Sequence, residues 1–227
     1  MKTTVHWLGG WASSLICWEE ILRETFPEFE HRFLETHALL DQKPAQARLT
    51  GLPSHHVVAA WSMGTLLAHH WMAQGLWPKE LPLLSLNPVF QFLRPGGFGE
   101  PILLRMEKKL ETDRDAVLRD FWRRMPKAGE IPPQWEEQWL AGTRGYSNAE
   151  LIHGLEFLRN TVVDPHSLSS VPSRWELLAG SGDLLATPIP DGGAPPNALY
   201  LQYVGGHLPF WECPDIIRAS LNRLVLP

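Results

Sequence analysis

Six short apolar runs alternate with helical patterns along this chain, and no other feature of the sequence limits the possible folds as strongly. The runs span residues 3–8, 31–36, 56–61, 81–86, 174–179 and 198–204. Continuous apolar runs of this length, separated by helices, are typical of parallel strands that are covered on both faces. The sequence therefore predicts an α/β fold with a sheet of about six strands, mostly or entirely parallel and joined by right-handed crossovers.

Two helices between these strands have recognisable ends. Ser13 and Ser14 precede an apolar stripe with three- to four-residue spacing, and they predict a capped helix over residues 15–26. A second helix follows the third run with almost no loop, spans residues 63–74 and ends at Gly75. Glycine often stops helices, so this end is well marked.

The alternation stops after Asn87 and resumes only at the fifth run. The residues between show no strand signal and contain helix-like stretches divided by proline and glycine; the clearest helix, over 115–125, has an apolar stripe. We therefore expect a helical cap, residues 89–167, inserted into an α/β core. That core consists of residues 1–88 and 168–227.

Composition excludes several classes of protein. The 227 residues suffice for one domain, or for one domain with an insertion. A net charge of −5 argues against nucleic-acid binding, and no apolar run approaches the roughly 20 residues that cross a bilayer. The N-terminus lacks the apolar stretch of an export signal, so we expect a cytoplasmic protein with neither nucleic acid nor membrane as a partner. Cys17 and Cys213 form neither a disulfide framework nor a metal site.

Ser62 stands where a buried strand ends and a helix begins at once. In such a tight strand-to-helix turn, known as a nucleophile elbow, a serine hydroxyl is lifted above the sheet. Ala60 and Gly64, two residues to either side, are small enough for neighbouring backbone to pass close by. A helix-capping serine after an ordinary strand would give a similar local pattern, so Ser62 is a candidate nucleophile that needs partners.

The first partner is a base, and His207 has the most suggestive position among the ten histidines. It follows the last apolar run after Gly205 and Gly206, which let the chain turn sharply. The turn would place the imidazole over the carboxyl edge of the sheet, where ligands bind in open α/β sheets. We therefore predict that His207 is the general base for Ser62.

The second partner is a carboxylate that orients the base. Asp183 follows the fifth run in a glycine-rich turn, whereas Asp164 is the best alternative acid and Asp191 lies further from its strand. A turn-forming aspartate would also suit the position of Asp183. The order Ser62, Asp183, His207, each at the carboxyl end of a strand, is that of the catalytic triad in α/β-hydrolases.

Ester cleavage also needs two backbone N–H groups that bind the developing oxyanion. Met63 is one candidate, because it follows Ser62 at a helix N-terminus whose dipole favours negative charge. The other should come from the loop after the first run, and Trp11 is our choice because Gly10 lets the backbone turn toward the site. A plain strand-to-helix turn would explain Gly9 and Gly10 equally well.

Taken together, nearly the whole chain resembles an α/β-hydrolase, and most closely the pimeloyl-acyl carrier protein methyl ester esterases of biotin synthesis. The segments that carry the resemblance are residues 8–11, 61–64, 154–164, 180–188 and 205–210. The resemblance implies that the first two strands of the usual sheet are missing here, because residues 3–8 lead straight into the loop of Trp11. Two positions depart from that family: Ala60 stands where glycine is usual, and Gly9 stands where histidine is usual. The second departure raises the question of what supports the loop that carries Trp11, which we call the oxyanion loop.

The resemblance implies a serine carboxylesterase that hydrolyses an acyl ester, with a methyl ester as the expected substrate, and that needs no metal or organic cofactor. In that family the ester is a pimeloyl group carried on acyl carrier protein. The alternatives are a short-acyl esterase, thioesterase or peptidase that acts on free small molecules. A non-catalytic receptor or scaffold on the same fold is an alternative of a different class.

Two groups of side chains are candidates for contacts with such a substrate. Trp61, Phe90 and Trp122 could line an apolar acyl pocket, and several of the eleven tryptophans should lie in the cleft between core and cap. Residues 105–127 carry eight basic and five acidic side chains, which makes this segment +3 and the remainder −8. The candidate contacts to an acidic carrier protein are Arg105, Arg119, Arg123 and Arg124. A solvated helix with internal ion pairs would have the same charges.

Overall fold

The structure is a computed structural model that describes residues 2–14, 16–40, 49, 51–53, 55–93, 99–125, 134–186 and 193–225. Six strands form one sheet in the order β2-β1-β3-β4-β5-β6, and every neighbouring pair is parallel. The strands are β1 (Thr4–Leu8), β2 (Glu30–Leu34), β3 (Val57–Trp61), β4 (Leu83–Leu86), β5 (Trp175–Gly180) and β6 (Leu199–Tyr203). Each lies within two residues of its predicted position, and the predicted fold class is confirmed.

The burial of the strands explains why their sequences are apolar runs rather than alternating patterns. Every residue of the four central strands, β1, β3, β4 and β5, is buried, because helices cover both faces of the sheet. The edge strands β2 and β6 are partly exposed along most of their length.

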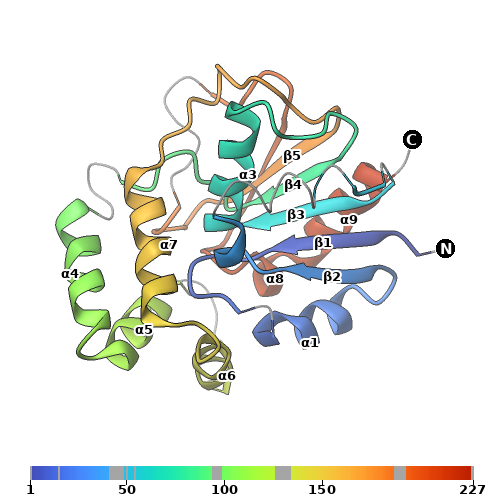
Figure 1. Cartoon of the computed structure of the whole chain (residues 1–227). Helices are drawn as coiled ribbons and strands as arrows, with labels where there is room; N and C mark the ends of the chain where they lie inside the picture. The colour runs from blue at the N-terminus through green and yellow to red at the C-terminus, as the bar shows by residue number, and fades with distance from the viewer. Residues whose placement is uncertain are drawn as a thin grey trace.

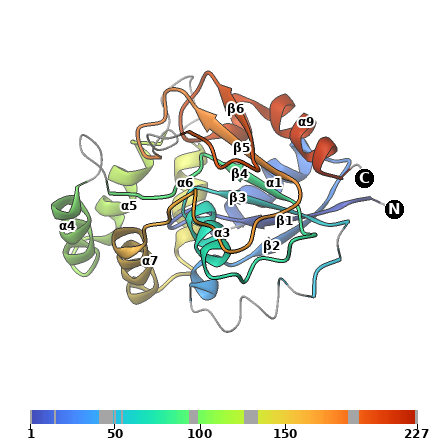
Figure 2. The ribbon, with the colours of Figure 1, turned by 90° about the horizontal axis from the view of Figure 1, so that it is seen from above.

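Helices cover the sheet on both sides (Figures 1 and 2). Helix α3 (Met63–Ala73) packs on one face, whereas α1 (Ile16–Thr25) and α9 (Pro214–Val225) pack on the other. The ends of α1 and α3 agree with the predicted helices to within one residue, although Leu15 lies outside the described residues. A short 3₁₀ helix, η1 (His37–Leu39), follows β2, and α8 (Pro209–Glu212) precedes α9.

Four helices between β4 and β5 form a layer beside the carboxyl ends of the strands, opposite both chain termini (Figure 1). They are α4 (Glu100–Leu110), α5 (Arg114–Trp122), α6 (Gln134–Thr143) and α7 (Asn148–Asn160), and we call them the cap helices. The helix predicted over 115–125 ends three residues earlier and begins at Arg114, and the carboxylate of the preceding Asp113 caps the Ala116 N–H at 3.3 Å. The division into core and cap domains stays a prediction.

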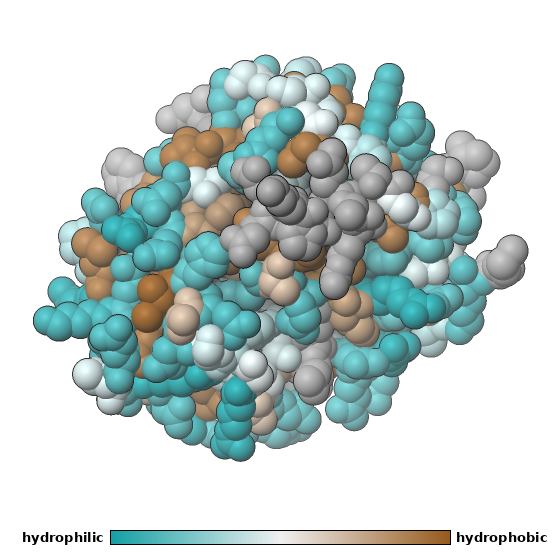
Figure 3. All heavy atoms as spheres, in the orientation of Figure 1, coloured by the Kyte–Doolittle hydropathy of each residue, from teal (hydrophilic) through white to brown (hydrophobic). Residues whose placement is uncertain are grey.

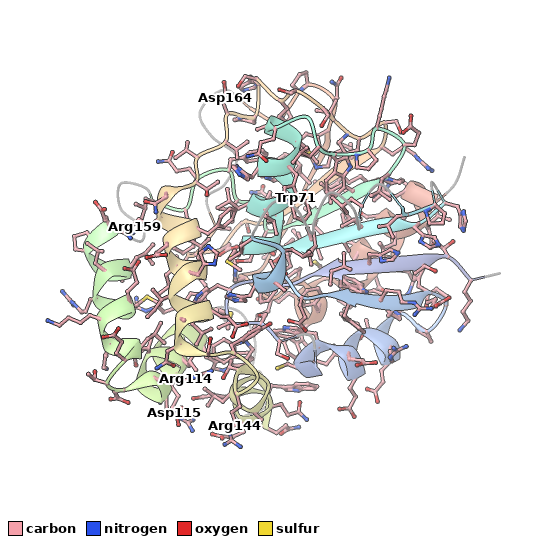
Figure 4. The ribbon with its side chains drawn as sticks, viewed as in Figure 1. Trp71, Arg114, Asp115, Arg144, Arg159 and Asp164 are labelled. Atoms are coloured by element: carbon pink, nitrogen blue, oxygen red, sulfur yellow. The ribbon has the colours of Figure 1, made fainter. Side chains whose placement is uncertain are left out.

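The cap helices are joined by polar contacts at the two ends of α7 (Figure 4). At one end, the Arg159 guanidinium lies 3.4 Å from Glu107 and 3.7 Å from Glu100 of α4. At the other end, Arg114 of α5 donates hydrogen bonds to the Tyr146 carbonyl (2.7 Å) and to Asn148. These contacts hold α4, α5 and α7 together as one layer.

The cap begins and ends in extended backbone, which the sequence did not indicate. Gln91 and Val162 form an isolated antiparallel bridge, and the Val163 N–H donates to the Phe90 carbonyl at 2.8 Å. The segments that enter and leave the cap are therefore paired. A bridge of this length has too few residues for an alternating pattern to reveal it.

Aromatic side chains fill the boundary between the sheet and the cap helices. The ring of Trp11 packs edge-on against Phe121 of α5 at 4.8 Å, and Trp135 of α6 packs against Trp211 of α8 at 5.2 Å. Figure 3 shows one face of the molecule, where hydrophilic residues predominate and hydrophobic residues form separate patches. Among the described residues, no helix is both long enough and apolar enough to cross a membrane.

Three buried histidines make the stability of this fold sensitive to acid. Burial lowers the pKa of His6, His37 and His69 from 6.5 to about 4. Between these values the unfolded chain binds protons that the folded chain does not, so stability falls as the pH drops. Well above pH 6.5 these side chains are neutral in both states and contribute no pH dependence.

We therefore expect the free energy of unfolding, measured in urea, to fall between pH 6.5 and 4 through the uptake of about three protons by these side chains. These three side chains would contribute at most about 4 kcal/mol per pH unit to the slope, because each proton contributes about 1.4 kcal/mol per pH unit. His69→Gln removes one of these protons and should therefore reduce the steepest slope by about 1.4 kcal/mol per pH unit. An unchanged slope in this variant would contradict the assignment of a neutral, buried His69.

Candidate active site

The Ser62 turn joins β3 to α3 in a conformation that few non-glycine residues adopt. Its backbone lies at φ 55° and ψ −119°, and the Ser62 N–H donates to the Leu86 carbonyl of the neighbouring strand at 3.1 Å. A Cβ on Gly64 would lie 2.6 Å from the Leu8 carbonyl oxygen and 2.8 Å from that of Gly9. Only glycine therefore lets the loop after β1 lie against the start of α3, as an elbow requires.

His207 follows β6 and lies over the carboxyl edge of the sheet beside Ser62. Its Nε2 is 2.9 Å from the Ser62 Oγ. The indole Nε1 of Trp61, the residue before the serine, donates to the His207 carbonyl at 2.8 Å. The turn that carries the base is thus hydrogen-bonded to the residue adjacent to the serine, which fixes the distance between the two.

Asp183, in the turn after β5, completes a chain of three side chains. Its Oδ2 lies 2.7 Å from the His207 Nδ1, while its Oδ1 accepts the N–H groups of Leu185 (2.8 Å) and Ala186 (3.0 Å). Burial opposes ionisation, but the electrostatic interaction with His207 and these hydrogen bonds together lower the pKa of Asp183 below its ordinary value.

The carboxylate fixes the tautomer of the imidazole. An ionised Asp183 can only accept, so the His207 Nδ1 carries the proton, and Nε2 is free to accept the hydroxyl proton of Ser62. The side chain of His207 is 1% exposed and that of Asp183 3% exposed, and Ser62 is 6% exposed. In such surroundings these hydrogen bonds are little screened by water.

The alternative acids do not take this position in the described part of the chain. Asp164 is exposed, and its carboxylate accepts the His166 N–H at 2.9 Å, so it stabilises its own turn (labelled in Figure 4). Asp191 lies outside the described residues. Of the aspartates considered from sequence, the structure brings Asp183 to His207.

The two predicted oxyanion donors flank Ser62, one in the loop after β1 and one at the start of α3. Within the described part of the chain, the backbone N–H groups of Trp11 and Met63 have no hydrogen-bond acceptor. Both groups are therefore available to a ligand. Their assignment to an oxyanion hole stays a prediction.

The loop that carries Trp11 is braced from the segment after β2, which answers the question posed by Gly9. The Thr36 hydroxyl donates to the Gly9 carbonyl at 3.0 Å, and the Ala12 N–H donates to the His37 Nε2 at 3.2 Å. A histidine thus supports the loop from another part of the chain. Sequence analysis missed His37, because nothing local distinguishes it from other histidines.

Asn87 is a second residue that sequence analysis missed. It is fully buried at the end of β4, with φ 48°. Its Nδ2 donates to the Asp183 Oδ2 (2.5 Å) and to the Gly206 carbonyl (3.0 Å), and its Oδ1 accepts the Tyr203 hydroxyl at 3.1 Å. It therefore holds the acid and the turn before His207 together. Its position directly after a strand, in line with the other site residues, was the available signal.

The predicted substrate-binding aromatic residues are all buried in packing. Trp61 contacts the His207 ring at 5.3 Å between ring centres, Phe90 stacks on His69 at 4.1 Å, and Trp122 packs on Trp139 of α6 at 5.4 Å. A role in substrate binding stays a prediction for each. Among the described residues, no group of three or more His, Cys, Asp and Glu side chains is arranged to hold a metal ion.

The four predicted carrier-protein contacts differ in their surroundings. Arg119 lies 3.1 Å from Glu136 and 2.8 Å from Glu137 of α6, and Arg123 lies 3.8 Å from Asp120. Arg105 and Arg124 are exposed beside a cavity of about 290 Å³ between α4 and α5. Lys127, the last basic residue of that segment, lies outside the described residues.

Comparison with protein-family models and with curated protein sequences finds no match. Solved structures, in contrast, match along almost the whole chain. An esterase (EaEST) from Exiguobacterium antarcticum has a TM-score of 0.73 and 15% identity, with 98% of this chain and 91% of that chain covered. The enol-lactonase from Burkholderia xenovorans LB400 has a TM-score of 0.74 and 13% identity, with 99% and 92% covered.

A bromoperoxidase from Bacillus anthracis has a TM-score of 0.72 and 14% identity, with 98% of this chain and 92% of that chain covered. At these identities the similarity shows the fold alone. The chain has the α/β-hydrolase fold.

The contacts of Asn87 predict a large effect of its substitution on stability. We expect Asn87→Ala to lower the free energy of unfolding by about 3–5 kcal/mol. Hydrogen bonds to charged groups contribute about 1.5–3 kcal/mol, and positive φ costs alanine about 1–2 kcal/mol. Asn87→Gly removes the same side chain without the backbone cost, so urea denaturation should find it about 1–2 kcal/mol more stable than Asn87→Ala. Equal stabilities would contradict the backbone part of this explanation.

Proposed function

We propose that this protein is a serine hydrolase that cleaves carboxylic esters. The observation that carries the proposal is the continuous hydrogen-bonded chain from Ser62 through His207 to Asp183, with distances of 2.9 Å and 2.7 Å. The fold supports it, because each of the three residues follows the carboxyl end of a strand. The similar solved structures include proteins described as esterases.

In the first half of the reaction, His207 Nε2 takes the hydroxyl proton as Ser62 Oγ attacks the ester carbonyl. The tetrahedral intermediate then collapses, and His207 returns the proton to the departing alcohol. Asp183 stabilises the imidazolium that forms between these steps. The product is an acyl group bound to Ser62 through an ester bond.

In the second half, water replaces the alcohol. His207 Nε2 takes a proton from water, the hydroxide attacks the acyl carbonyl, and the Ser62 Oγ leaves with the proton that His207 returns. The N–H groups of Trp11 and Met63 would bind the oxyanion in both halves. Each such donor typically contributes about 10²–10³-fold to the rate. Neither half requires a metal or an organic cofactor.

For the substrate, we propose a methyl ester of an acyl chain, with the carrier-bound pimeloyl ester of biotin synthesis as the specific candidate. Two features support an acyl substrate that is presented by an acidic partner. First, aromatic rings line the boundary between the sheet and the cap helices. Second, the exposed side chains of Arg105 and Arg124 line a cavity together with the apolar Met106 and Phe121. Basic side chains on a chain of net charge −5 would attract an acidic carrier protein.

The nucleophile can be tested by a single substitution. We expect Ser62→Ala to reduce kcat for p-nitrophenyl ester hydrolysis by about 10⁴-fold or more, because the covalent step is lost while other site residues remain. Ser169→Ala, at an exposed serine that is hydrogen-bonded to the opposite end of α3 from Ser62, is the matched control and should keep full activity. Retention of activity in Ser62→Ala would point to another nucleophile, whereas a folded wild type with no measurable hydrolysis would favour the non-catalytic scaffold.

The acyl substrate needs a separate test. A panel of methyl, p-nitrophenyl and thioesters with the same acyl chain should give the highest kcat/KM for oxygen esters, and preference for the thioester would contradict the methyl esterase proposal. The specific candidate is tested genetically. The gene should restore growth without biotin in a strain that lacks its methyl ester esterase, whereas Ser62→Ala should not.

A further inference from the structure

Helix α7 of the cap contacts the loop that carries the proposed oxyanion donor Trp11. The indole Nε1 of Trp11 donates to the Leu151 carbonyl of α7 at 2.9 Å. His37 accepts the Ala12 N–H at its Nε2, and its Nδ1 lies 3.0 Å from the carbonyl oxygen of Glu150, also in α7. Two consecutive carbonyls of one cap helix are thus bonded to the loop, one directly and one through an imidazole.

The imidazole of His37 joins the loop to α7, and its two partners fix which ring nitrogen carries the proton. A carbonyl can only accept, so Nδ1 carries the proton and donates to Glu150, while Nε2 accepts from Ala12. Burial lowers the pKa of His37 to about 4, which keeps this neutral form at ordinary pH. A protonated ring would have no lone pair for the Ala12 N–H.

Gly154 allows α7 to approach the loop this closely. A Cβ at this position would lie 2.6 Å from the His37 Cε1 and 2.8 Å from the Trp11 Cδ1. Both atoms belong to buried rings that are hydrogen-bonded to carbonyls of α7 itself, so neither ring can move away from the helix without breaking a bond. Any larger residue would therefore push α7 away from the loop.

The loop needs this external support. Ala12 lies at φ 53°, a left-handed conformation that costs a residue with a Cβ about 1–2 kcal/mol. On its other side, the Trp11 ring packs edge-on against Phe121 of α5 at 4.8 Å. The side chain of Trp11 is therefore held between two cap helices, and the direction of its backbone N–H depends on their position.

We infer that α7 positions the oxyanion loop, with Gly154 and His37 as positioning residues. This inference rests on the proposed function, because it concerns the donor that would bind the oxyanion. With α7 in the observed place, the loop that carries Trp11 lies against Ser62, and a Cβ on Gly10 would be 3.2 Å from the Ser62 Cβ. Displacement of α7 would misdirect this donor, so the cap controls the rate of acyl transfer as well as covering the site.

The test compares Gly154→Ala with Gly145→Ala, an exposed cap glycine whose added Cβ would meet its nearest atom at 3.7 Å. We expect Gly154→Ala to lower kcat by about 10²–10³-fold, the loss typical of one oxyanion donor, with KM little changed. Affinity for a trifluoromethyl ketone, which forms an oxyanion adduct on serine, should fall by a similar factor. Gly145→Ala should match the wild type in all three measurements.

A second pair of variants separates positioning from folding. His37→Phe keeps a buried ring but removes both hydrogen bonds, whereas His37→Gln keeps one donor and one acceptor. We expect the first to lower kcat and trifluoromethyl ketone affinity with KM little changed, and the second to recover a substantial part of the loss. Circular dichroism would show whether each variant is folded. If Gly154→Ala does not fold, the two His37 variants alone test the role of α7.

The outcomes distinguish this inference from the proposed function. A folded Gly154→Ala or His37→Phe with wild-type kcat and wild-type affinity for the trifluoromethyl ketone would overturn the role of α7. Ester hydrolysis by the wild type that does not depend on Ser62 would overturn the proposed function instead.

Discussion

The backbone at Ser62 lies in a conformation that costs a non-glycine residue about 1–3 kcal/mol, and the surrounding structure is arranged to hold it there. Its N–H is bonded to β4 and its carbonyl accepts the Thr65 N–H at 2.8 Å. Gly64 lets the loop after β1 lie against the start of α3. These contacts lift the Ser62 hydroxyl to His207 and bring the Trp11 loop beside it, so the geometry of the whole site depends on this turn.

The parts of this site that could be predicted from sequence are those with a local signal. The strands β1, β3, β4 and β5 are covered on both faces, and so they appear as apolar runs. Ser62, Asp183 and His207 each come within four residues of the end of a strand, where the carboxyl ends of parallel strands meet at one edge. Their pairing by hydrogen bonds is therefore a consequence of strand order, which the alternation of strands and helices already indicated.

The parts that could not be predicted are hydrogen bonds between segments far apart in the chain. Asn87 is bonded to Asp183, 96 residues away, and His37 is bonded to Glu150, 113 residues away. Neither contact has a periodicity or a motif, because each depends on how a loop is seated after the sheet and the cap helices have packed. The same reason explains why Gly154 looks like an ordinary helix residue in the sequence, although its lack of a side chain lets α7 reach the oxyanion loop.

The central claim is that Ser62 is a nucleophile activated by His207, and covalent labelling tests it most directly. The intact protein would be treated with a fluorophosphonate, and the modified peptide would be identified by mass spectrometry. The expected result is one adduct per chain, on Ser62, formed much more slowly in His207→Ala and absent in Ser62→Ala. A folded wild-type protein that forms no adduct, or forms it on another residue, would contradict the account.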